Sequence, residues 1–249
     1  MIYVVLPVFN EEGTIEEQIR RVREVLDRSC GGGQVIVVND GSTDRTSDHL
    51  QQIKGAAVEI VEHPVNRGLR AALYTGWQHA LRRAHADDII VTMDGDNTHP
   101  PALIPMMRAC MRQGAEVVIA SRYVAGARIV GLGWHRRLFS WGANRLFRGF
   151  CPIPDVRDYT CGYRAYRACA LQETCPYWEA TAHTGQGFSI TAEVLLQLRK
   201  LSVPMAEVPL TLRYDRKRGK SKMRVLPTMV ETFRLLRRHG GRRLEPRST

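Results

Sequence analysis

The sequence has no apolar run near the roughly 18 residues that a membrane-spanning helix needs. Its start, MIYVVLPVFNEEG, is too short and too acidic for a signal peptide. The six cysteines include no CxxC pair and no spacing typical of a metal site. We therefore expect a cytoplasmic chain with reduced thiols, and neither a disulfide framework nor a zinc site.

Two common nucleotide-binding motifs are also missing. Neither GxGxxG nor GxxxxGK[ST] follows the first apolar run at residues 2–8. A dinucleotide-dependent dehydrogenase and a P-loop ATPase are therefore disfavoured. A sugar nucleotidyltransferase would have a glycine-rich basic loop at this place, where the chain has the acidic stretch NEEG at residues 10–13.

Charge is divided unevenly along the chain. Residues 1–120 contain 12 Lys and Arg and 16 Asp and Glu, a net charge of −4, whereas residues 121–249 contain 24 and 9, a net charge of +15. We expect the second half to contact an anion, with a solvated basic face as the alternative. Nucleic acid is disfavoured as that anion, because the basic residues are not interleaved with aromatic side chains as in a stacking platform.

Strand and helix patterns alternate in the first half, which predicts an α/β fold with a parallel sheet and right-handed crossovers. Nearly continuous apolar runs, typical of strands covered on both faces, occur at residues 2–8, 34–40, 56–63, 88–94 and 115–121. Helical periodicity occurs at residues 14–28, 44–53, 68–84 and 100–114, with Thr14 and Asp44 at expected N-cap positions. The 249 residues suit one large domain.

The second half is less regular. A basic loop leading into a helix is expected at 126–150, another helix at 187–200 and a late strand at 203–215. An amphipathic helix is expected from residue 227, before a tail rich in arginine. Its apolar stripe is expected to contain Met229, Val230, Phe233 and Leu236.

Polar clusters follow three of the expected strands, at NEEG, at NDGS and at DGD. Because ligands bind outside the carboxyl ends of parallel strands, we expect these clusters to converge on one crevice. Asp40 could accept hydrogen bonds from a base or ribose there. Pro7 and residues 10–12 could form the floor and edge of a base pocket, although Glu11 also suits a helix N-terminus.

The aspartates of DGD allow two functional interpretations. A phosphohydrolase with an aspartyl nucleophile would need the pair on the first strand and further acidic ligands on later strands, and the sequence has neither. A site for Mg²⁺ or Mn²⁺ and a diphosphate fits better, because Asp94 and Asp96, at alternate positions of an extended segment, would point to the same side. A solvated turn that caps the helix at Pro100 is the structural alternative.

Several motifs, taken in order, resemble those of the family 2 glycosyltransferases. They are PVFNEEGTI, VVNDGSTDRT, NRGLRAALYTGW, MDGDNTHPP, ASRYVAG, RRLFSWGANRLFRG, DYTCGYRAYR and EVPLTLRYDRKRGKSKM. Within the family, the similarity is to polyprenyl-phosphate (dolichol-phosphate) mannosyl- and glucosyltransferases. It implies a single-domain glycosyltransferase A fold, a Rossmann-like, mostly parallel sheet flanked by helices. The implied catalytic domain is 1–224, with a nucleotide-sugar half at 1–120, an acceptor half at 121–224, and an amphipathic helix and basic tail at 225–249.

The resemblance also implies roles for individual residues. Positions around the base and ribose are Pro7, Asn10, Glu11 and Asp40. The pair that holds Mg²⁺ or Mn²⁺ against the diphosphate is Asp94 and Asp96. The acceptor phosphate would be held by Arg122, Arg136 and Ser140. The basic loop over the donor phosphates would contain Arg216, Ser221 and Lys222. The chain departs from the family pattern at Asn39, usually Asp, and at Thr98, often Gln.

The implied reaction is the inverting transfer of a hexose from a nucleotide sugar, with mannose from GDP-mannose as the first expectation, to a polyprenyl phosphate. An alternative within the family is another donor, such as UDP-glucose, with a soluble small-molecule or saccharide acceptor. A lipid acceptor would require peripheral contact with the cytoplasmic face of the membrane, through the basic second half and the helix that begins near residue 226.

Overall fold

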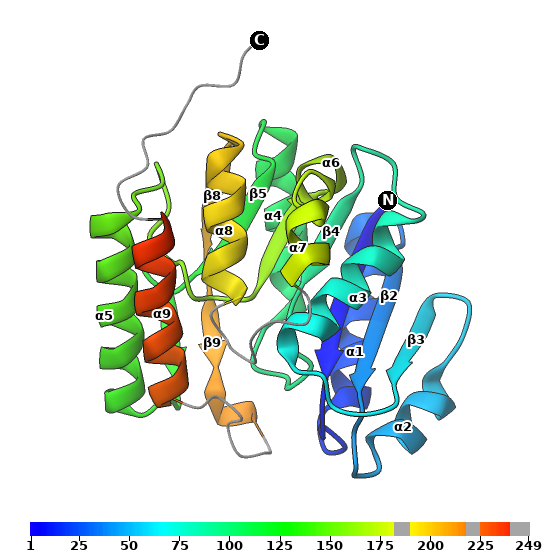
Figure 1. Cartoon of the computed structure of the whole chain (residues 1–249). Helices are drawn as coiled ribbons and strands as arrows, with labels where there is room; N and C mark the ends of the chain where they lie inside the picture. Colours follow the sequence, from blue (N-terminus) through cyan, green and yellow to red (C-terminus); the bar gives the residue numbers. More distant parts are fainter. Residues whose placement is uncertain (182–189, 218–224, 240–249) are drawn as a thin grey trace.

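The computed structural model describes residues 1–181, 190–217 and 225–239. Its centre is a seven-stranded sheet with the order β3-β2-β1-β4-β7-β5-β8, and helices cover both faces of it (Figure 1). In chain order the strands of this sheet are β1 (Ile2–Val8), β2 (Gln34–Asp40), β3 (Val58–His63), β4 (Ile89–Thr92), β5 (Val117–Ser121), β7 (Arg164–Arg167) and β8 (Met205–Pro209).

The five apolar runs of the first half all form strands of this sheet. β1 pairs in parallel with both β2 and β4, and β2 pairs in parallel with β3. Almost every residue of β1, β2, β4 and β5 is buried, which is why these runs are apolar without alternation. The predicted parallel arrangement is confirmed for them.

β7 was missed by the sequence analysis, although it lies in the middle of the sheet. It runs antiparallel to β4 on one side and to β5 on the other. Its four residues, RAYR, begin and end with arginine, which is not the pattern of a central strand. Arg164 is nevertheless fully buried, because its guanidinium donates to the backbone carbonyls of Tyr159, at 2.8 Å, and of Thr191.

The helices expected in the first half are present as α1 (Ile15–Val25), α2 (Thr46–Ile53), α3 (Leu69–Leu81) and α4 (Ile104–Arg112). The second half contains α5 (Trp134–Phe150), α6 (Ala168–Gln172), α7 (Cys175–Thr181), α8 (Ile190–Lys200) and α9 (Val225–His239). Thr14 occupies the N-cap position of α1 without a side-chain cap hydrogen bond. Asp44 lies one residue before the N-cap of α2, and its carboxylate accepts from the Thr46 amide at 3.0 Å. In the described part of the chain, none of the helices combines the length and the apolarity needed to cross a bilayer.

The single late strand expected at 203–215 is divided between two sheets. β8 pairs with β5, whereas β9 (Thr211–Arg213) pairs with β6 (Arg128–Val130) in a separate two-stranded sheet. Leu210 joins them: its N–H donates to Ser121 and its carbonyl accepts from Arg128, both at 2.9 Å. The chain therefore changes sheets without losing backbone hydrogen bonds.

The apolar stripe expected on the last helix is also divided. Val230 and Phe233 are 50% and 57% exposed, whereas Leu236 is 7% exposed and joins the core beside Leu235. At 3.6 residues per turn, Leu236 lies about 120° around the helix from Val230, so the two cannot share one face. The side chain of Met229 lies outside the described residues. α9 packs beside α5 at the end of the molecule opposite β3 (Figure 1).

One hydrophobic cluster extends through both halves of the chain, from β1 and β2 to α8 and α9. Trp77 of α3 connects the halves directly, because its ring contacts Tyr166 of β7 and Trp178 of α7 edge-on. Its indole N–H donates to Thr92 of β4 at 3.1 Å. The chain therefore folds as a single domain around a continuous core.

Candidate active site

The polar clusters that follow β1, β2 and β4 line one cavity of about 470 Å³. β1 lies between β2 and β4 in the sheet, so their carboxyl ends are adjacent. Among the cavity residues are Pro7, Glu11, Asp40, Asp94 and Asp96. The convergence expected from strand order is therefore present.

The residues predicted to hold an acceptor phosphate line the same cavity from the other side. Arg122 follows β5, and Arg136 and Ser140 lie on α5. The cavity thus lies between the edge of the sheet and helix α5. It brings the aspartate pair and these basic residues together, although they are far apart in the sequence.

Asn10 has a different environment. In the described part of the chain it is not among the residues that line the cavity. Its Oδ1 accepts from the Thr43 amide at 2.7 Å, and its Nδ2 donates to Thr43 Oγ1 at 3.2 Å. Its φ of 51° is in the left-handed region that asparagine tolerates better than most residues. Asn10 therefore ties the loop after β1 to the loop after β2.

The predicted basic loop is only partly described. Arg216 lines a separate outer pocket beside α1, together with Arg21 and Asn97, while its neighbour Lys217 lines the main cavity. Ser221 and Lys222 lie outside the described residues. Lys217, which was not singled out from the sequence, is thus the described residue of this loop that faces the aspartate pair.

Asp96 is buried and has several partners. Its Oδ1 accepts from the Thr98 hydroxyl at 2.7 Å and from the Thr98 amide at 3.2 Å, and its Oδ2 pairs with the ammonium of Lys217. Burial is the largest single effect and acts to raise the pKa of Asp96, but the charge of Lys217 and the hydrogen bonds of Lys217 and Thr98 act together with His99 to hold the pKa below its usual value. Asp96 is therefore held as a carboxylate.

Asp94 is less constrained, with a side chain that is 46% exposed. Partial desolvation in the cavity and the neighbouring charge of Asp96 raise its pKa. His99 lies 3.9 Å from its carboxylate, but His99 Nδ1 accepts a hydrogen bond from the Asp94 amide at 3.1 Å. That nitrogen therefore carries no proton, and the contact is not an ion pair.

The backbone around the aspartate pair differs from the extended segment that we expected. β4 ends at Thr92, so both aspartates lie in the following loop, in which Asn97 has a φ of 62°. Gly95 lies against β1, where a Cβ would approach Val8 Cγ2 to 2.9 Å. Close packing of this loop, rather than strand alternation, brings both side chains to the cavity.

The donor set of this loop fits Mg²⁺ or Mn²⁺. The protein alone does not supply a complete metal site: in residues 1–181, 190–217 and 225–239, no group of three or more His, Cys, Asp and Glu side chains could hold a metal ion. Mg²⁺ commonly binds through one or two protein carboxylates and completes its shell with phosphate oxygens and water. Asp94 and Asp96 can supply those carboxylates, and a diphosphate in the cavity would supply the phosphate oxygens.

Asp40 organises the loop that leads into α3. One carboxylate oxygen contacts His63 Nδ1 at 2.7 Å and accepts from the Arg67 amide at 2.9 Å, and the other accepts from the Gly68 amide at 2.8 Å. His63 Nε2 in turn contacts the Thr75 hydroxyl at 3.0 Å. Asp40 therefore has a structural role in addition to lining the cavity.

The departure at Asn39 has a structural reason. Asn39 is buried, donates through Nδ2 to Ser47 Oγ at 2.8 Å, and accepts at Oδ1 from the Ser42 amide at 3.2 Å. An ionised aspartate has no N–H to donate, so it could not make the same pair of bonds with Ser47 as acceptor. Asparagine thus closes the loop between β2 and α2.

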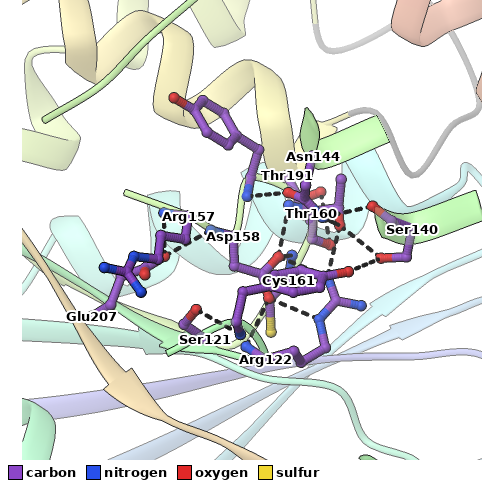
Figure 2. A network of polar contacts seen from close by, with 12 residues as sticks. Ser121, Arg122, Ser140, Asn144, Arg157, Asp158, Thr160, Cys161, Thr191 and Glu207 are labelled. Carbon is purple, nitrogen blue, oxygen red and sulfur yellow. Dashed lines mark hydrogen bonds and ion pairs between the residues drawn. The ribbon is translucent and has the colours of Figure 1, made fainter. Parts of the chain in front are cut away.

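Arg122 is paired with Asp158, a residue to which the sequence analysis gave no role (Figure 2). Its Nε and Nη2 donate to the two oxygens of Asp158, each at 2.7 Å, and Nη2 also donates to Thr160 at 2.6 Å. Burial is the largest single effect and acts to raise the pKa of Asp158, but the charge and hydrogen bonds of Arg122, together with the Thr160 amide, hold the pKa below its usual value. The motif DYTCGYRAYR contained this partner, but only the fold shows that it meets Arg122.

Further polar residues hold this pair in place (Figure 2). The amides of Thr160 and Cys161 donate to Asp158 at 3.2 and 3.0 Å, and Glu207 of β8 accepts from the Asp158 amide at 2.7 Å. Asn144 of α5 donates to Thr160 Oγ1 at 3.0 Å. The network joins β5, α5 and β8 around the predicted acceptor residues.

Tyr214 connects the acceptor side to the aspartate pair. Its hydroxyl accepts from Arg136 at 2.5 Å. The Arg136 guanidinium and the Lys217 ammonium lie 5.8 and 5.7 Å from its ring centroid, within the range of cation–π contacts. Arg136, Tyr214, Lys217 and Asp96 therefore form a continuous path across the cavity.

An aspartate pair at the carboxyl edge of the sheet, in a cavity that basic residues of α5 also line, is the arrangement of an α/β protein with its ligand site at the strand ends. The family model for glycosyl transferase family 2 matches residues 3–174. The chain belongs to this family and is a glycosyltransferase. The glycosyltransferase A type of fold expected from the sequence is confirmed.

Two curated relatives match most of the chain. The dolichol-phosphate mannosyltransferase of Pyrococcus furiosus is 29% identical over 242 residues, which cover 95% of this chain and 64% of that protein. The undecaprenyl-phosphate mannosyltransferase of Micrococcus luteus is 29% identical over 224 residues, which cover 89% of this chain and 87% of that protein. The chain thus spans somewhat less than two thirds of the first relative.

A solved structure shares the fold. Glucosyl-3-phosphoglycerate synthase from Mycobacterium tuberculosis, in complex with Mn²⁺, UDP and phosphoglyceric acid, superposes with a TM-score of 0.63 and 21% identity. The match covers 95% of this chain and 75% of that chain.

The Arg122–Asp158 pair generates a prediction about stability and pH. Asp158→Asn should lower the free energy of unfolding at neutral pH by about 3–5 kcal/mol, because it leaves the guanidinium buried without its carboxylate. Since the folded-state pKa of Asp158 is lowered, its contribution is complete above the unfolded pKa of about 3.9 and is lost as pH falls through the lower folded value. The difference between variant and wild type should therefore shrink below about pH 4.

Urea denaturation at neutral pH and in steps down to about pH 3 measures this difference. Asp215→Asn, which breaks the more exposed pair of Asp215 with Arg213, is the control and should have little effect. A difference for Asp158→Asn that does not vary with pH would contradict the assignment.

Proposed function

We propose that the protein transfers a hexose, with mannose from GDP-mannose as the first choice, to a polyprenyl phosphate with inversion at the anomeric carbon. The observation that carries the proposal is that Asp94, Asp96 and the basic residue Arg136 line one and the same cavity. The names of the Pyrococcus and Micrococcus relatives support the choice of sugar and acceptor.

The acceptor in this proposal needs positioning more than it needs a base. A phosphate monoester has a second pKa near 6 and is mostly dianionic at neutral pH, so it is already nucleophilic. Arg136 and Ser140 of α5 would hold it, since arginine suits contact with phosphate oxygens. Arg122, which forms an ion pair with Asp158, would help them to hold the phosphate at the cavity wall. Transfer to an alcohol would require a base, for which Asp94 and Asp96 are the nearest candidates.

The donor would lie along the carboxyl edge of the sheet. Pro7, Glu11 and Asp40 line the part of the cavity proposed for the base and ribose, and Asn10 supports it from the adjoining loop. A divalent metal bound by Asp94 and Asp96 would stabilise the negative charge that grows on the leaving nucleoside diphosphate. Additional positive charge is proposed to come from the basic loop, which contains Arg216, Ser221 and Lys222.

A second candidate function keeps the reaction and changes both substrates. The Mycobacterium neighbour was crystallised with UDP and phosphoglyceric acid, which is a soluble acceptor that carries a phosphate. The same cavity could accept such a molecule, because Arg136 and Ser140 would contact the phosphate and not the rest of the acceptor. UDP-glucose with a soluble phosphate-bearing acceptor is therefore the alternative.

A donor and acceptor panel tests the proposal. GDP-mannose and UDP-glucose are each incubated with a short polyprenyl phosphate or with phosphoglycerate, in Mg²⁺ or Mn²⁺. Lipid-linked mannose is the expected product, and excess chelator should abolish it. Asp96→Asn should lower the transfer rate on the order of 100-fold or more while the circular dichroism spectrum is retained.

Asp87→Asn, an exposed aspartate after α3, is the matched control and should leave the rate unchanged. Turnover of the wild type in excess chelator would refute the metal-dependent mechanism. If product formed only with the pair UDP-glucose and phosphoglycerate, the second function would replace the first.

The acceptor role of Arg136 gives a separate prediction. Arg136→Ala should raise the KM for a short, soluble polyprenyl phosphate about 10- to 100-fold, the loss expected for a charge-assisted hydrogen bond. The affinity for the nucleoside diphosphate should change little. Steady-state kinetics and calorimetry measure the two quantities, with Arg137→Ala, the exposed neighbour on α5, as the control. A lost nucleotide affinity with an unchanged acceptor KM would move Arg136 to the donor side.

A polyprenyl acceptor would also require contact with a membrane surface, and we propose that α5 and α9 provide it. The outer face of α5 exposes large apolar side chains, while its inner face carries Arg136 and Ser140. The exposed apolar residues of the two helices are Trp134, Leu138, Trp141, Phe150, Val230 and Phe233. Exposed arginines flank them at positions 137, 145, 148, 234, 237 and 238. An anionic leaflet fits this combination of charge and apolar area.

Liposome flotation tests this contact. Binding should increase with the fraction of anionic lipid and decrease with salt. Replacing Trp134 and Trp141 together by serine should weaken binding on the order of tenfold or more, because two large apolar side chains no longer enter the interface. Met106→Ser, at an exposed apolar position of α4, is the control. Failure of the wild type to float with anionic liposomes at low salt would favour the soluble acceptor.

A further inference from the structure

Lys217 is a largely buried cation that already contacts one of the two aspartates. It follows the short 3₁₀ turn at Tyr214–Arg216, and its side chain is 11% exposed. Its ammonium pairs with Asp96 Oδ2, and the Asp96 side chain is 9% exposed. Both residues line the main cavity. A cation of the chain itself thus neutralises one of the carboxylates that the proposed metal would use.

This contact stabilises the aspartate loop before any ligand is bound. Two neighbouring carboxylates repel each other, and burying one of them without a partner is costly. The ammonium compensates Asp96, while Asp94 stays partly exposed to solvent. Thr98 occupies the other oxygen of Asp96. A divalent ion that binds Asp96 at Oδ2 therefore competes with the ammonium, because two cations in contact with one oxygen repel each other.

The displaced ammonium would need a new anionic partner, because it is largely shielded from water. A donor diphosphate in the same cavity would be such a partner. Tyr214 would keep the lysine close to it, since the ammonium already lies 5.7 Å from the Tyr214 ring centroid. The Tyr214 hydroxyl is in turn fixed by Arg136 at 2.5 Å.

We propose that Lys217 is the resident counter-ion of Asp96, and that it moves to the donor diphosphate when a divalent metal takes its place. Metal and nucleotide then bind cooperatively, because the metal alone leaves Lys217 without a partner and the nucleotide supplies one. The inference rests on the proposed metal–diphosphate site. Such coupling is reciprocal: each ligand raises the affinity for the other by the same factor.

A purely structural role for Lys217 predicts the opposite sign. If the ammonium only held the loop in shape, its removal would disorder Asp96 and weaken metal binding. If it is a competing counter-ion, its removal strengthens the binding of metal alone. The affinity for metal without nucleotide therefore separates the two roles.

The experiment measures Mn²⁺ binding to the full chain by electron paramagnetic resonance of the free ion, without nucleotide and with GDP or UDP. In Lys217→Met, Mn²⁺ alone should bind about tenfold more tightly, and the enhancement by nucleotide should fall by a similar factor. GDP or UDP should bind less tightly to the Mn²⁺-loaded variant than to the Mn²⁺-loaded wild type. Lys217→Arg should retain the coupling, and Lys54→Met, at an exposed position after α2, should match the wild type.

The outcomes also distinguish this inference from the function on which it rests. Unchanged or weaker Mn²⁺ binding by Lys217→Met, with binding by the wild type that is lost in Asp96→Asn, overturns the counter-ion role and leaves the proposed metal site intact. Absence of Mn²⁺ binding to the wild type, both with and without nucleotide, overturns both.

Discussion

A carboxylate that is removed from water needs cations or N–H groups in place of the water molecules. The partners that the buried aspartates bind determine the shape of this cavity. Asp40 contacts an imidazole and two backbone amides, which fixes the loop into α3. Asp158 binds Arg122 through side chain and backbone, which fixes the loop after β5. Asp96 uses Lys217, from a segment 121 residues away. Each of these contacts ties segments that are distant in the sequence together at the edge of the sheet, so the cavity walls depend on them.

The parts of the fold that could be predicted from the sequence are strands in which nearly every residue is buried, because their burial is visible as an unbroken apolar run. The strands at 2–8 and 34–40 are covered on both faces, so their sequences are apolar runs. β7 could not be found in this way, because Arg164 is buried through carbonyl groups that only the folded chain brings to it. The late strand was predicted as one element because its apolar residues continue through Leu210. At Leu210 the backbone hydrogen bonds pass from one sheet to the other.

The residues of the site also divide into those that the sequence predicts and those that only the fold reveals. The ends of parallel strands had to converge, which predicts Asp40, Asp94 and Asp96 at one cavity. The side chain of a given basic residue is harder to place, because neighbouring residues on a tight 3₁₀ turn point about 120° apart. Arg216 and Lys217 are adjacent on and just after such a turn, and they line different pockets. The sequence places a basic segment near the donor, but only the backbone decides which residue reaches it.

Part of the positive charge of the second half is used within the fold. Arginines of the second half serve the fold: Arg122 pairs with Asp158, and Arg167 donates to the carbonyls of Asp87 and Met111. Of the described residues that line the cavity, the acidic ones are Glu11, Asp40, Asp94 and Asp96, and the basic ones are Arg122, Arg136 and Lys217. A diphosphate would therefore enter a lining with more carboxylates than basic side chains. Among the described residues, a divalent cation held by the aspartate pair would reverse that sign, so the metal and the proposed basic loop would together supply the positive charge of the donor site.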